Sequence, residues 1–284
     1  MATKNIKQHL KNNAIYYLLI LLTAWGLKFN YSRADSDELL WVLAPTAGLV
    51  ELISGIAFKK EAHTGFVGQG NRFIIAPACA GINFLIIAFC MSAFSGMHAF
   101  KRQRSKLLWL GTAFLSAYLL TIVINALRIF VSIHTYAAHI QLGWFTPARI
   151  HRLEGVVIYF FFLTLFYMII NNAIYKFRGG AAGKKPASAR LAVERRNYVG
   201  WVCAGLIPYS WYGLHTLVVP LINGAMRQNP GRFAEHGVMV LTASGAVLAI
   251  FLLTRIVIHH VALRHRKSII RRRITRLRRA DEPS

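Results

Sequence analysis

Long apolar stretches alternate with short polar segments along this chain. A helix that crosses a bilayer needs about 20 predominantly apolar residues, and its backbone polar groups must be paired within the helix. The stretches that meet this requirement cleanly lie at residues 14–30, 73–97, 107–134, 151–175, 198–223 and 237–260. The pattern therefore predicts an all-α, polytopic helical membrane protein with about six crossing helices.

Residues 39–58 form a further apolar stretch, which a polar, Gly-rich loop follows. Pro45, Gly48, Gly55 and the charged Glu51 interrupt this stretch. If it crossed the membrane, the strongly basic loop KRQRSK would be placed on the outside. Both chain ends are basic, and an even number of crossings keeps them on the same side. The stretch is therefore predicted to be a broken or re-entrant segment, with an ordinary crossing as the alternative.

Composition and charge support a membrane protein rather than a soluble one. Hydrophobic residues make up 55% of the chain and charged residues 15%, and the mean hydropathy is +0.43. These values exclude a soluble thiol hydrolase. A formal net charge of +24 would indicate nucleic-acid binding in a soluble protein. Here the Lys and Arg residues lie between apolar stretches, so the positive-inside rule predicts a multi-pass protein of the cytoplasmic (inner) membrane, with both termini cytoplasmic and no nucleic-acid partner.

The same pattern divides the chain into parts. The expected parts are a membrane core at 1–176, a basic cytoplasmic linker at 177–197, two additional transmembrane helices at 198–260 and an Arg-rich cytoplasmic tail at 261–284. The tail is expected to be attracted to anionic lipid, by around 1 kcal/mol per basic residue near the surface. Trp211, His215 and the prolines nearby are interpreted as interfacial residues of a kinked helix, with a pocket as the alternative.

Three chemically active residues, Cys79, Arg128 and His151, lie at matching ends of three different predicted spans. Each is about 22–25 residues from the nearest basic cytoplasmic segment, which corresponds to about 33–38 Å along a helix. That distance places all three near the outer boundary of the hydrocarbon core. The spacing therefore predicts a thiol site that faces the periplasm or exterior.

Such a set of side chains supports nucleophilic acyl transfer. A Cys79 thiolate can attack a carbonyl carbon, and His151 can take the thiol proton and return it to a leaving amine. Arg128 stays charged and can hold the developing oxyanion with a fork of donors. Pro77 and Gly81 would loosen the helix start beside the thiol and let a substrate backbone approach.

Each of these residues also has an ordinary structural interpretation. A lone cysteine in a membrane protein is often an apolar filler, and this is how Cys90 and Cys203 are interpreted. An arginine at a helix end can snorkel to the interface, and His151 can lie among the headgroups. His134 and His139 are rival bases. The sequence contains no cluster with metal-ligand spacing and no phosphate-binding loop, so no metal and no cofactor is expected.

The segments PACAGI around Cys79, NALR ending at Arg128 and HRLEG beginning at His151 resemble the three motifs of the exosortase/archaeosortase family. In that family the motifs are a Cys with Gly two residues later, Asn-x-x-Arg, and a His with Gly four residues later. The residues that complete them here are Gly81, Asn125 and Gly155. The stretch ELLWVLAPTAGLVELISGIAF, with the Gly-rich loop and ACAGINF after it, is similar to the exosortase K subtype. The resemblance covers roughly residues 10–176.

This resemblance implies an integral-membrane cysteine protease or transpeptidase. It implies that the protein cleaves C-terminal sorting signals of exported proteins on the outer face of the cytoplasmic membrane, through a thioacyl intermediate. Such a signal consists of a short motif (Pro-Glu-Pro in many subfamilies), a transmembrane helix and a basic end. Cys79 would be the nucleophile, Arg128 the oxyanion or thiolate partner, and His151 the general acid/base.

Two further residues are expected to support this site. Asn125 lies three residues before Arg128 on the same helix face and could orient the guanidinium. Glu154 could orient the imidazole, with Arg149 and Arg152 as competitors for its charge. The sequence departs from the family where an alanine stands between the Cys and the Gly, a position that often holds Ser.

A membrane transporter or an assembly scaffold without enzymatic activity is the competing class. Glu51, Arg128 and His151 could line a permeation path. However, no internal repeat is visible, and the ionisable residues lie at a membrane edge rather than at the midplane. The partners expected under the family interpretation are exported substrate proteins, membrane lipids and an amine or glycolipid acceptor. The residues leave open the recognition motif, the choice between hydrolysis and transpeptidation, the role of 197–284 and the oligomeric state.

Overall fold

The computed structural model describes residues 2–71, 73–137, 143, 146–179 and 204–280. The chain is mostly helical, which confirms the polytopic helical fold class that the apolar pattern predicts. In the described residues four helices are long and apolar enough to cross a membrane, namely Pro77–Met97, Gln103–Tyr136, Pro147–Phe177 and Pro230–Val261. The predicted span at 14–30 lies within one continuous helix. Most of the predicted linker and part of the span at 198–223 lie outside the described residues, as do His139 and Cys203.

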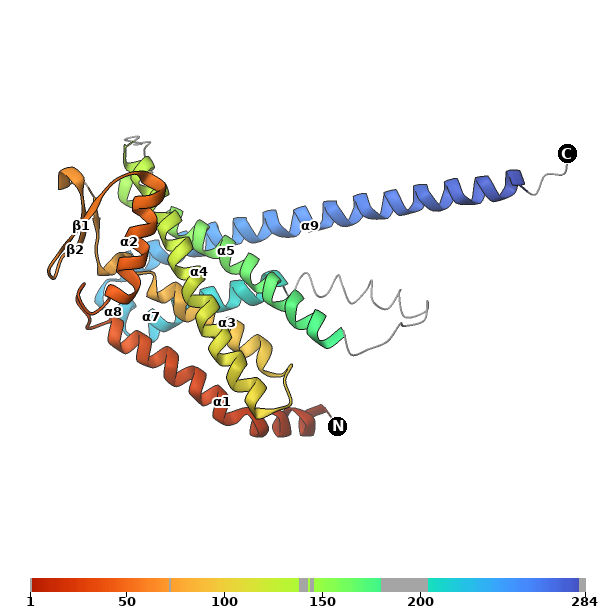
Figure 1. Ribbon diagram of the computed structural model, residues 1–284, viewed down its shortest axis with the longest axis horizontal. Helices are drawn as coiled ribbons and strands as arrows, with labels where there is room; N and C mark the ends of the chain where they lie inside the picture. The colour runs from red at the N-terminus through yellow and green to blue at the C-terminus, as the bar shows by residue number, and fades with distance from the viewer. Residues whose placement is uncertain (1, 72, 138–142, 144–145, 180–203, 281–284) are drawn as a thin grey trace.

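Helix α3, Ile82–Met97, lies at the centre of the bundle (Figure 1). It packs against α1, Ala2–Tyr31, against α4, Gln103–Ala137, and against α5, Pro147–Gly179. Its side chains are apolar on every face, and most of them are buried. A helix that is hydrophobic all round is expected at such a buried position. Because α3 also follows the Cys79 segment directly, the best-packed helix supports the candidate nucleophile.

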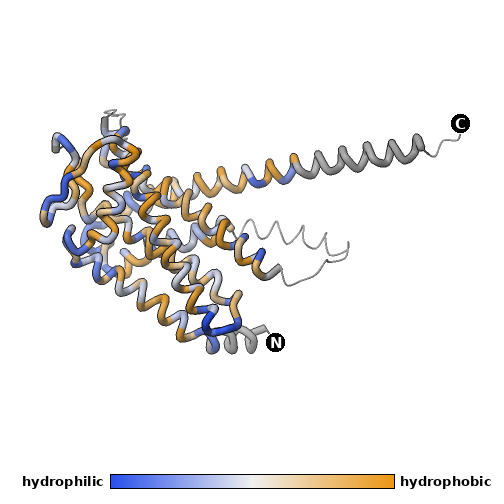
Figure 2. The backbone as a smooth tube through the Cα atoms, in the orientation of Figure 1, coloured by the Kyte–Doolittle hydropathy of each residue, from blue (hydrophilic) through white to orange (hydrophobic). Residues whose placement is uncertain are grey.

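The turn between α3 and α4 brings these two helices into close antiparallel contact. At Gly96 an added Cβ would come within 2.2 Å of the Trp109 ring, so only glycine allows this approach. Figure 2 shows hydrophobic residues along the middle of the bundle helices. It shows hydrophilic residues at the α3–α4 turn, which lies close to the N-terminal end of α1, and at the strands on the opposite side of the bundle. This distribution is what a lipid-embedded bundle with two polar ends requires.

Helix α2, Leu40–Ser54, is continuous through Pro45 and ends at Gly55, which adopts a left-handed conformation (φ 72°). Its 15 residues correspond to about 22 Å, which is shorter than a hydrocarbon core of about 30 Å. The helix packs beside α4, where the Tyr118 hydroxyl donates to the Trp41 carbonyl oxygen at 2.6 Å. The predicted break lies at Gly55, inside residues 39–58, whereas Pro45 and Gly48 do not interrupt the helix. The helix continues because the Trp41 carbonyl oxygen, which loses its donor at Pro45, accepts from the Tyr118 hydroxyl.

A small antiparallel sheet follows α2, where the sequence pattern predicts a polar loop. Its strands are β1, Phe58–Glu61, β2, Gly65–Gly68, and β3, Ile74–Ile75, in the order β1-β2-β3. At Gly65, with φ 121°, an added Cβ would lie 2.3 Å from the Ile75 carbonyl oxygen. The glycines therefore allow β3 to pair closely, and they do not mark an unstructured loop. Strands this short carry too little alternation to be recognised from sequence.

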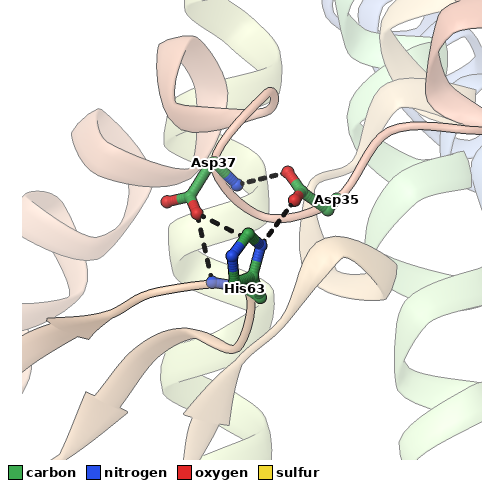
Figure 3. A group of neighbouring side chains, drawn as sticks. All are labelled: Asp35, Asp37 and His63. Carbon is green, nitrogen blue, oxygen red and sulfur yellow. Dashed lines mark hydrogen bonds and ion pairs between the residues drawn. The ribbon is translucent and has the colours of Figure 1, made fainter.

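Charged residues tie the tip of this hairpin to the α1–α2 connection (Figure 3). His63 Nδ1 lies 2.8 Å from Asp35 Oδ2, and the His63 backbone N–H donates to Asp37 Oδ2 at 3.1 Å. Lys60 pairs with the other oxygen of Asp37 at 2.8 Å. The hydrogen bond to Asp35 raises the pKa of His63, while hydrogen bonds from His63 and Lys60 lower the pKa values of Asp35 and Asp37. The group fixes one end of the strands that lead to Cys79.

The C-terminal part of the chain first packs against the bundle and then extends away from it. Residues 204–213 are helical and continue into a π-helical turn, Leu214–Val218, and then into α7, Val219–Ile222, and α8, Ala225–Gln228. Helix α9, Pro230–Ala280, packs its first part against α5 and then projects away from the other helices (Figure 1).

Candidate functional site

Cys79 lies in a short 3₁₀ turn, Pro77–Cys79, between β3 and α3. The predicted apolar span at 73–97 is therefore α-helical only from Ile82, and the residues before it form the short strand β3 and the 3₁₀ turn. Pro77 suits the first position of the turn because its φ is fixed. Gly81 precedes α3 in the left-handed region, with φ 71°. The half-buried thiol residue is thus presented on a turn at the N-terminal end of the central helix.

Helix α4 holds this turn from the side. The Asn125 side-chain amide donates a hydrogen bond to the Cys79 carbonyl oxygen. At Gly81 an added Cβ would lie 3.2 Å from Asn125 Cγ and 3.2 Å from the Thr121 methyl group. The glycine of the PACAGI segment therefore has two physical reasons, a left-handed backbone and close contact with α4. Asn125 is fully buried, so its amide is committed to the contacts of this site.

Arg128 lies one turn further along α4 and contacts two residues of α5. Its Nη1 donates to the Tyr159 hydroxyl at 3.1 Å, and its Nη2 lies 2.9 Å from His151 Nε2. The Tyr159 hydroxyl in turn donates to Asn125 Oδ1 at 2.8 Å. A phenol can accept one such bond and donate another. The contacts therefore run without interruption from the Cys79 carbonyl through the amide, the phenol and the guanidinium to the imidazole.

The imidazole of His151 is held at both nitrogens. Because Nε2 faces the Arg128 donor, it is the acceptor nitrogen, and the ring proton is assigned to Nδ1. Nδ1 then donates to the Ser132 hydroxyl at 2.9 Å, and this hydroxyl donates to Glu154 Oε2 at 3.0 Å. Glu154 therefore reaches the imidazole through Ser132 and not directly. The expected competitors take no part in this chain, because Arg149 and Arg152 both bind Glu235 of α9, at 2.9 and 3.0 Å.

Gly155 provides the space that Arg128 occupies. An added Cβ at this position would lie 3.3 Å from Arg128 Nε, which is closer than almost all real contacts of this kind. Gly155 lies one turn after His151, so the same helix face that carries the imidazole must be bare where the guanidinium crosses it. The His-x-x-x-Gly spacing is thus explained by the packing of α5 against one side chain of α4.

A cavity of about 530 Å³ opens beside these residues. The Cys79 turn and helices α4 and α5 contribute Gly81, Arg128 and Tyr159 to its lining, together with Ala78, the residue before Cys79. Part of the remaining lining comes from the C-terminal part of the chain, including Tyr212. Small-molecule and peptide sites are usually concave, with mostly apolar walls and a few converging polar groups. The position of this cavity next to the Cys79 turn makes it the candidate substrate site.

A comparison with protein families decides what kind of protein carries this arrangement. Residues 18–168 match the family model described as transmembrane exosortase, Exosortase_EpsH, and this match covers more than half of the chain. The chain belongs to this exosortase family. Membership implies a transmembrane protease that processes sorting signals. No curated protein and no solved structure matches the chain significantly.

Two site residues of this exosortase, Ser132 and Tyr159, are absent from the sequence-based prediction. Ser132 lies four residues after Arg128 in α4, and Tyr159 lies eight residues after His151 in α5. Both positions fall on the helix faces that already carry the motif residues. Helix periodicity applied to the motif positions would therefore have identified them. Whether they contact the site depends on how α4 and α5 pack.

The rival residues of the exosortase lie elsewhere. His134 Nδ1 pairs with the Phe130 carbonyl oxygen of its own helix at 2.9 Å. Cys90 is buried in the apolar core of α3, where burial raises the cost of a thiolate. Glu51 is exposed on α2 and does not line the cavity. Of the ionisable residues that the sequence singles out, Arg128 and His151 thus contact each other, and Cys79 is linked to them through its backbone carbonyl and Asn125.

One further group, on the hairpin and the α1–α2 connection, has the spacing of a metal site. Ligand atoms of Asp35, Asp37 and His63 lie within 4.8 Å of one another. All three side chains are at least partly exposed, and they are already engaged by one another and by Lys60. Their contacts are therefore explained as ion pairs that hold the hairpin, and the structure gives no reason to assign a metal there.

Proposed function

We propose that this exosortase cleaves C-terminal sorting signals of exported proteins and that Cys79 carries the acyl group. The observation that supports this most directly is the contact chain around the Cys79 turn. Asn125 binds the backbone of the turn, and Arg128 binds His151 beside the cavity. A thiol, a guanidinium and an imidazole on three separate segments are the groups that thiol-dependent acyl transfer needs.

The mechanism begins with the free protein, in which both nitrogens of His151 are occupied. We infer that substrate binding draws the Arg128 guanidinium toward the carbonyl oxygen of the scissile bond, and this frees Nε2. The Cys79 thiol proton then passes to Nε2 while sulfur bonds to the carbonyl carbon. The oxyanion forms against Arg128, whose fixed fork of donors suits it.

Collapse of this intermediate completes the first half of the reaction. The carbon–nitrogen bond breaks, and His151 returns its proton to the leaving amine, so that a thioester to Cys79 remains. Water or an amine then attacks the thioester, with His151 again accepting a proton, and the thiol is released. The hydroxyl of Ser132 and the carboxylate of Glu154 hold the imidazole in the required tautomer throughout.

The membrane arrangement forms part of the proposal. Both termini, the linker at 177–197 and the tail at 261–284 face the cytoplasm, and the site at Cys79 faces the exterior. The exosortase core at 1–176 is followed by two additional transmembrane helices at 198–260. We also place the chain in the exosortase K subtype, because of the stretch ELLWVLAPTAGLVELISGIAF and the Gly-rich segment after it. The acceptor is an amine, a glycolipid or water.

The test is a processing assay in a membrane host. A reporter that ends in a motif, an apolar helix and a basic tail is co-expressed with the wild type and with Cys79→Ala, Cys79→Ser and Cys90→Ala. We expect the wild type and Cys90→Ala to shorten the reporter, and both Cys79 variants to leave it full length. Hydroxylamine should cleave the thioester of the wild type, releasing the substrate as a hydroxamate and regenerating the thiol, and no hydroxamate should form with Cys79→Ala.

Processing by Cys79→Ala at the wild-type rate would contradict the assignment of the nucleophile. The scaffold or transporter interpretation would then replace it. A topology measurement is independent of this result. Cysteine labelling from outside with a membrane-impermeant reagent should reach Cys79 in a background that carries both Cys90→Ala and Cys203→Ala, and labelling from the cytoplasmic side alone would contradict the proposed orientation.

A further inference from the structure

The cavity beside the Cys79 turn has a second wall that lies outside the family match. The match ends at residue 168. The lining residues beyond that point are Tyr212, His215, Thr216, Val219, Pro220, Asn223, Ala225, Gln228 and His236. They belong to the segment that the sequence pattern assigns to additional membrane helices with interfacial aromatics. The structure places this segment against the candidate site.

Aromatic packing fixes this wall on the exosortase core. The Phe160 ring of α5 contacts the rings of Tyr209 and Tyr212, with centroids 6.0 and 5.7 Å apart. The Phe94 ring of α3 stacks on Trp211 at 5.4 Å. Such contacts contribute about 0.5–1.5 kcal/mol each beyond the area that they bury. The helical segment 204–213 is therefore anchored on both α3 and α5, next to the site.

An ion pair fixes the far side of the wall. Glu235, near the start of α9, accepts hydrogen bonds from Arg149 and Arg152. These arginines lie on either side of His151 at the start of α5. The π-helical turn, Leu214–Val218, lies between the two anchored points and directs His215 toward the core. The wall is held at both ends, so its residues keep a fixed position relative to the catalytic candidates.

The chemistry of the cavity is basic and polar at one end. Lys28 Nζ donates to Asn83 Oδ1 at 2.8 Å, and His215 Nε2 lies 3.4 Å from the same oxygen. Arg128 adds a second permanent cation to the lining, and His236 adds a second imidazole. None of the described residues that line the cavity carries a carboxylate. A cavity with these groups favours an anionic ligand, because cations without counter-charges focus a positive potential into it.

We propose that Lys28, Asn83 and His215 form a subsite for an anionic group of the substrate or acceptor, and that residues 204–236 determine specificity by forming its wall. This inference rests on the proposed function. Asn83 Oδ1 holds the ammonium and the imidazole side by side, and the ammonium keeps further N–H groups that can donate to a carboxylate or a phosphate oxygen. Because His215 lies outside the residues that match the family, the subsite provides selectivity in addition to what the three motifs provide.

The first experiment does not depend on processing. The full-length protein in lipid nanodiscs is alkylated at Cys79 with iodoacetate or with iodoacetamide, and the modified peptide is quantified by mass spectrometry. The two reagents are similar in size and differ in charge. The ratio of their rates is compared among the wild type, Lys28→Met and Lys59→Met. Lys59 is an exposed lysine of β1 and serves as the matched control, because its substitution removes the same charge outside the cavity.

We expect Lys28→Met to lower the iodoacetate/iodoacetamide ratio by roughly three- to tenfold, the effect of losing one nearby charge at intermediate dielectric. Lys59→Met should keep the wild-type ratio. An unchanged ratio for Lys28→Met would overturn the anionic subsite. This outcome is distinct from failure of the proposed function, which is decided by whether Cys79→Ala still processes the reporter.

A second experiment identifies the source of the anion, with a reporter that the wild type processes. If the group is a carboxylate of the sorting signal, changing that acid to its amide slows the wild type several-fold and leaves Lys28→Met unaffected. If it is a phosphate of the acceptor, Lys28→Met still cleaves, but the released protein lacks the acceptor mass. Either result supports the subsite. The subsite is contradicted if Lys28→Met and His215→Phe both respond to the acid-to-amide change as the wild type does and both release a protein that carries the acceptor mass.

Discussion

Arg128 Nη2 and His151 Nε2 lie 2.9 Å apart, so the candidate oxyanion donor and the candidate base bind each other in the free protein. The contact fixes the imidazole tautomer, because a nitrogen that faces a guanidinium donor must accept. It also occupies Nε2 until something else binds the guanidinium. The two residues therefore act as one unit, and a change at either should affect the other.

Replacing Arg128 with Lys should abolish most of the activity. A lysine keeps the charge but cannot reach the Tyr159 hydroxyl and His151 Nε2 at once. We expect reporter processing to fall by about 10²–10³, the usual loss for an oxyanion donor, with normal amounts of protein in the membrane. Initial rates of reporter shortening measure this. Arg104→Lys, on the exposed start of α4, is the control and should process normally; equal rates for both variants would rule out a bidentate role.

Removing the Ser132 hydroxyl should loosen the imidazole without removing it. Ser132→Ala breaks the link between His151 Nδ1 and the Glu154 carboxylate. We expect kcat to fall about tenfold to a hundredfold, as for other groups that orient a functional histidine, with KM nearly unchanged. Ser116→Ala is the matched control, because that hydroxyl bonds only to its own helix. A change confined to KM would show that Ser132 contacts the substrate and does not position His151.

Adding one methyl group at Gly155 should displace Arg128. The new Cβ would lie 3.3 Å from Nε, so the guanidinium must shift by a few tenths of an ångström and lose the geometry of both its hydrogen bonds. We expect processing to fall at least tenfold, since small misplacements are costly in catalysis. Gly111→Ala in α4, where a Cβ meets nothing within 4 Å, should keep full activity and raise helix stability by roughly 0.5–1 kcal/mol. Thermal unfolding in detergent separates the two effects.

The hairpin attachment should depend on pH. The Asp35 hydrogen bond raises the pKa of His63, so this contribution is complete below the ordinary imidazole pKa and is lost as pH rises through the raised value. The pKa values of Asp35 and Asp37 are lowered, so their contribution is complete above the ordinary carboxyl pKa and is lost as pH falls through the lowered values. The attachment is therefore strongest at weakly acidic pH.

Amide hydrogen exchange of residues 61–66, corrected for intrinsic rates, measures this dependence. Exchange should be faster at pH 8.5 than at pH 5.5 in the wild type. In His63→Asn the two should be equal, and asparagine is chosen because it tolerates the left-handed backbone at this position (φ 58°). Equal protection at the two pH values in the wild type would show that the strands hold the hairpin without the ion pairs.

The helical membrane fold could be predicted from the sequence because lipid imposes a strong and local rule. Every backbone polar group in the bilayer must be paired inside its own helix, so a long apolar stretch directly predicts a membrane-spanning helix. The short strands at 58–75 follow no such rule. Their pairing depends on close approach at Gly65 and on the ion pairs of Asp35 and Asp37, which come from a different part of the chain.

The sequence by itself identified the groups that we propose carry the chemistry. Cys79, Arg128 and His151 stand at matching ends of their spans, and this follows from residue spacing alone, because the rise per residue of a helix is fixed. Only the tertiary structure decided what these residues contact. Lateral packing of helices has no counterpart in the spacing along one chain.

That packing brings Tyr159 between Asn125 and Arg128, inserts Ser132 between the imidazole and its carboxylate, and places His215 on the wall of the cavity. The aromatic residues near 211 illustrate the difference. By composition alone they suit a membrane interface. In the structure, however, they pack against the rings of Phe94 on α3 and Phe160 on α5, and this packing places the segment beside the candidate site. A side chain's partner is set by the helix that packs against it, and this is the information that a single sequence pattern does not contain.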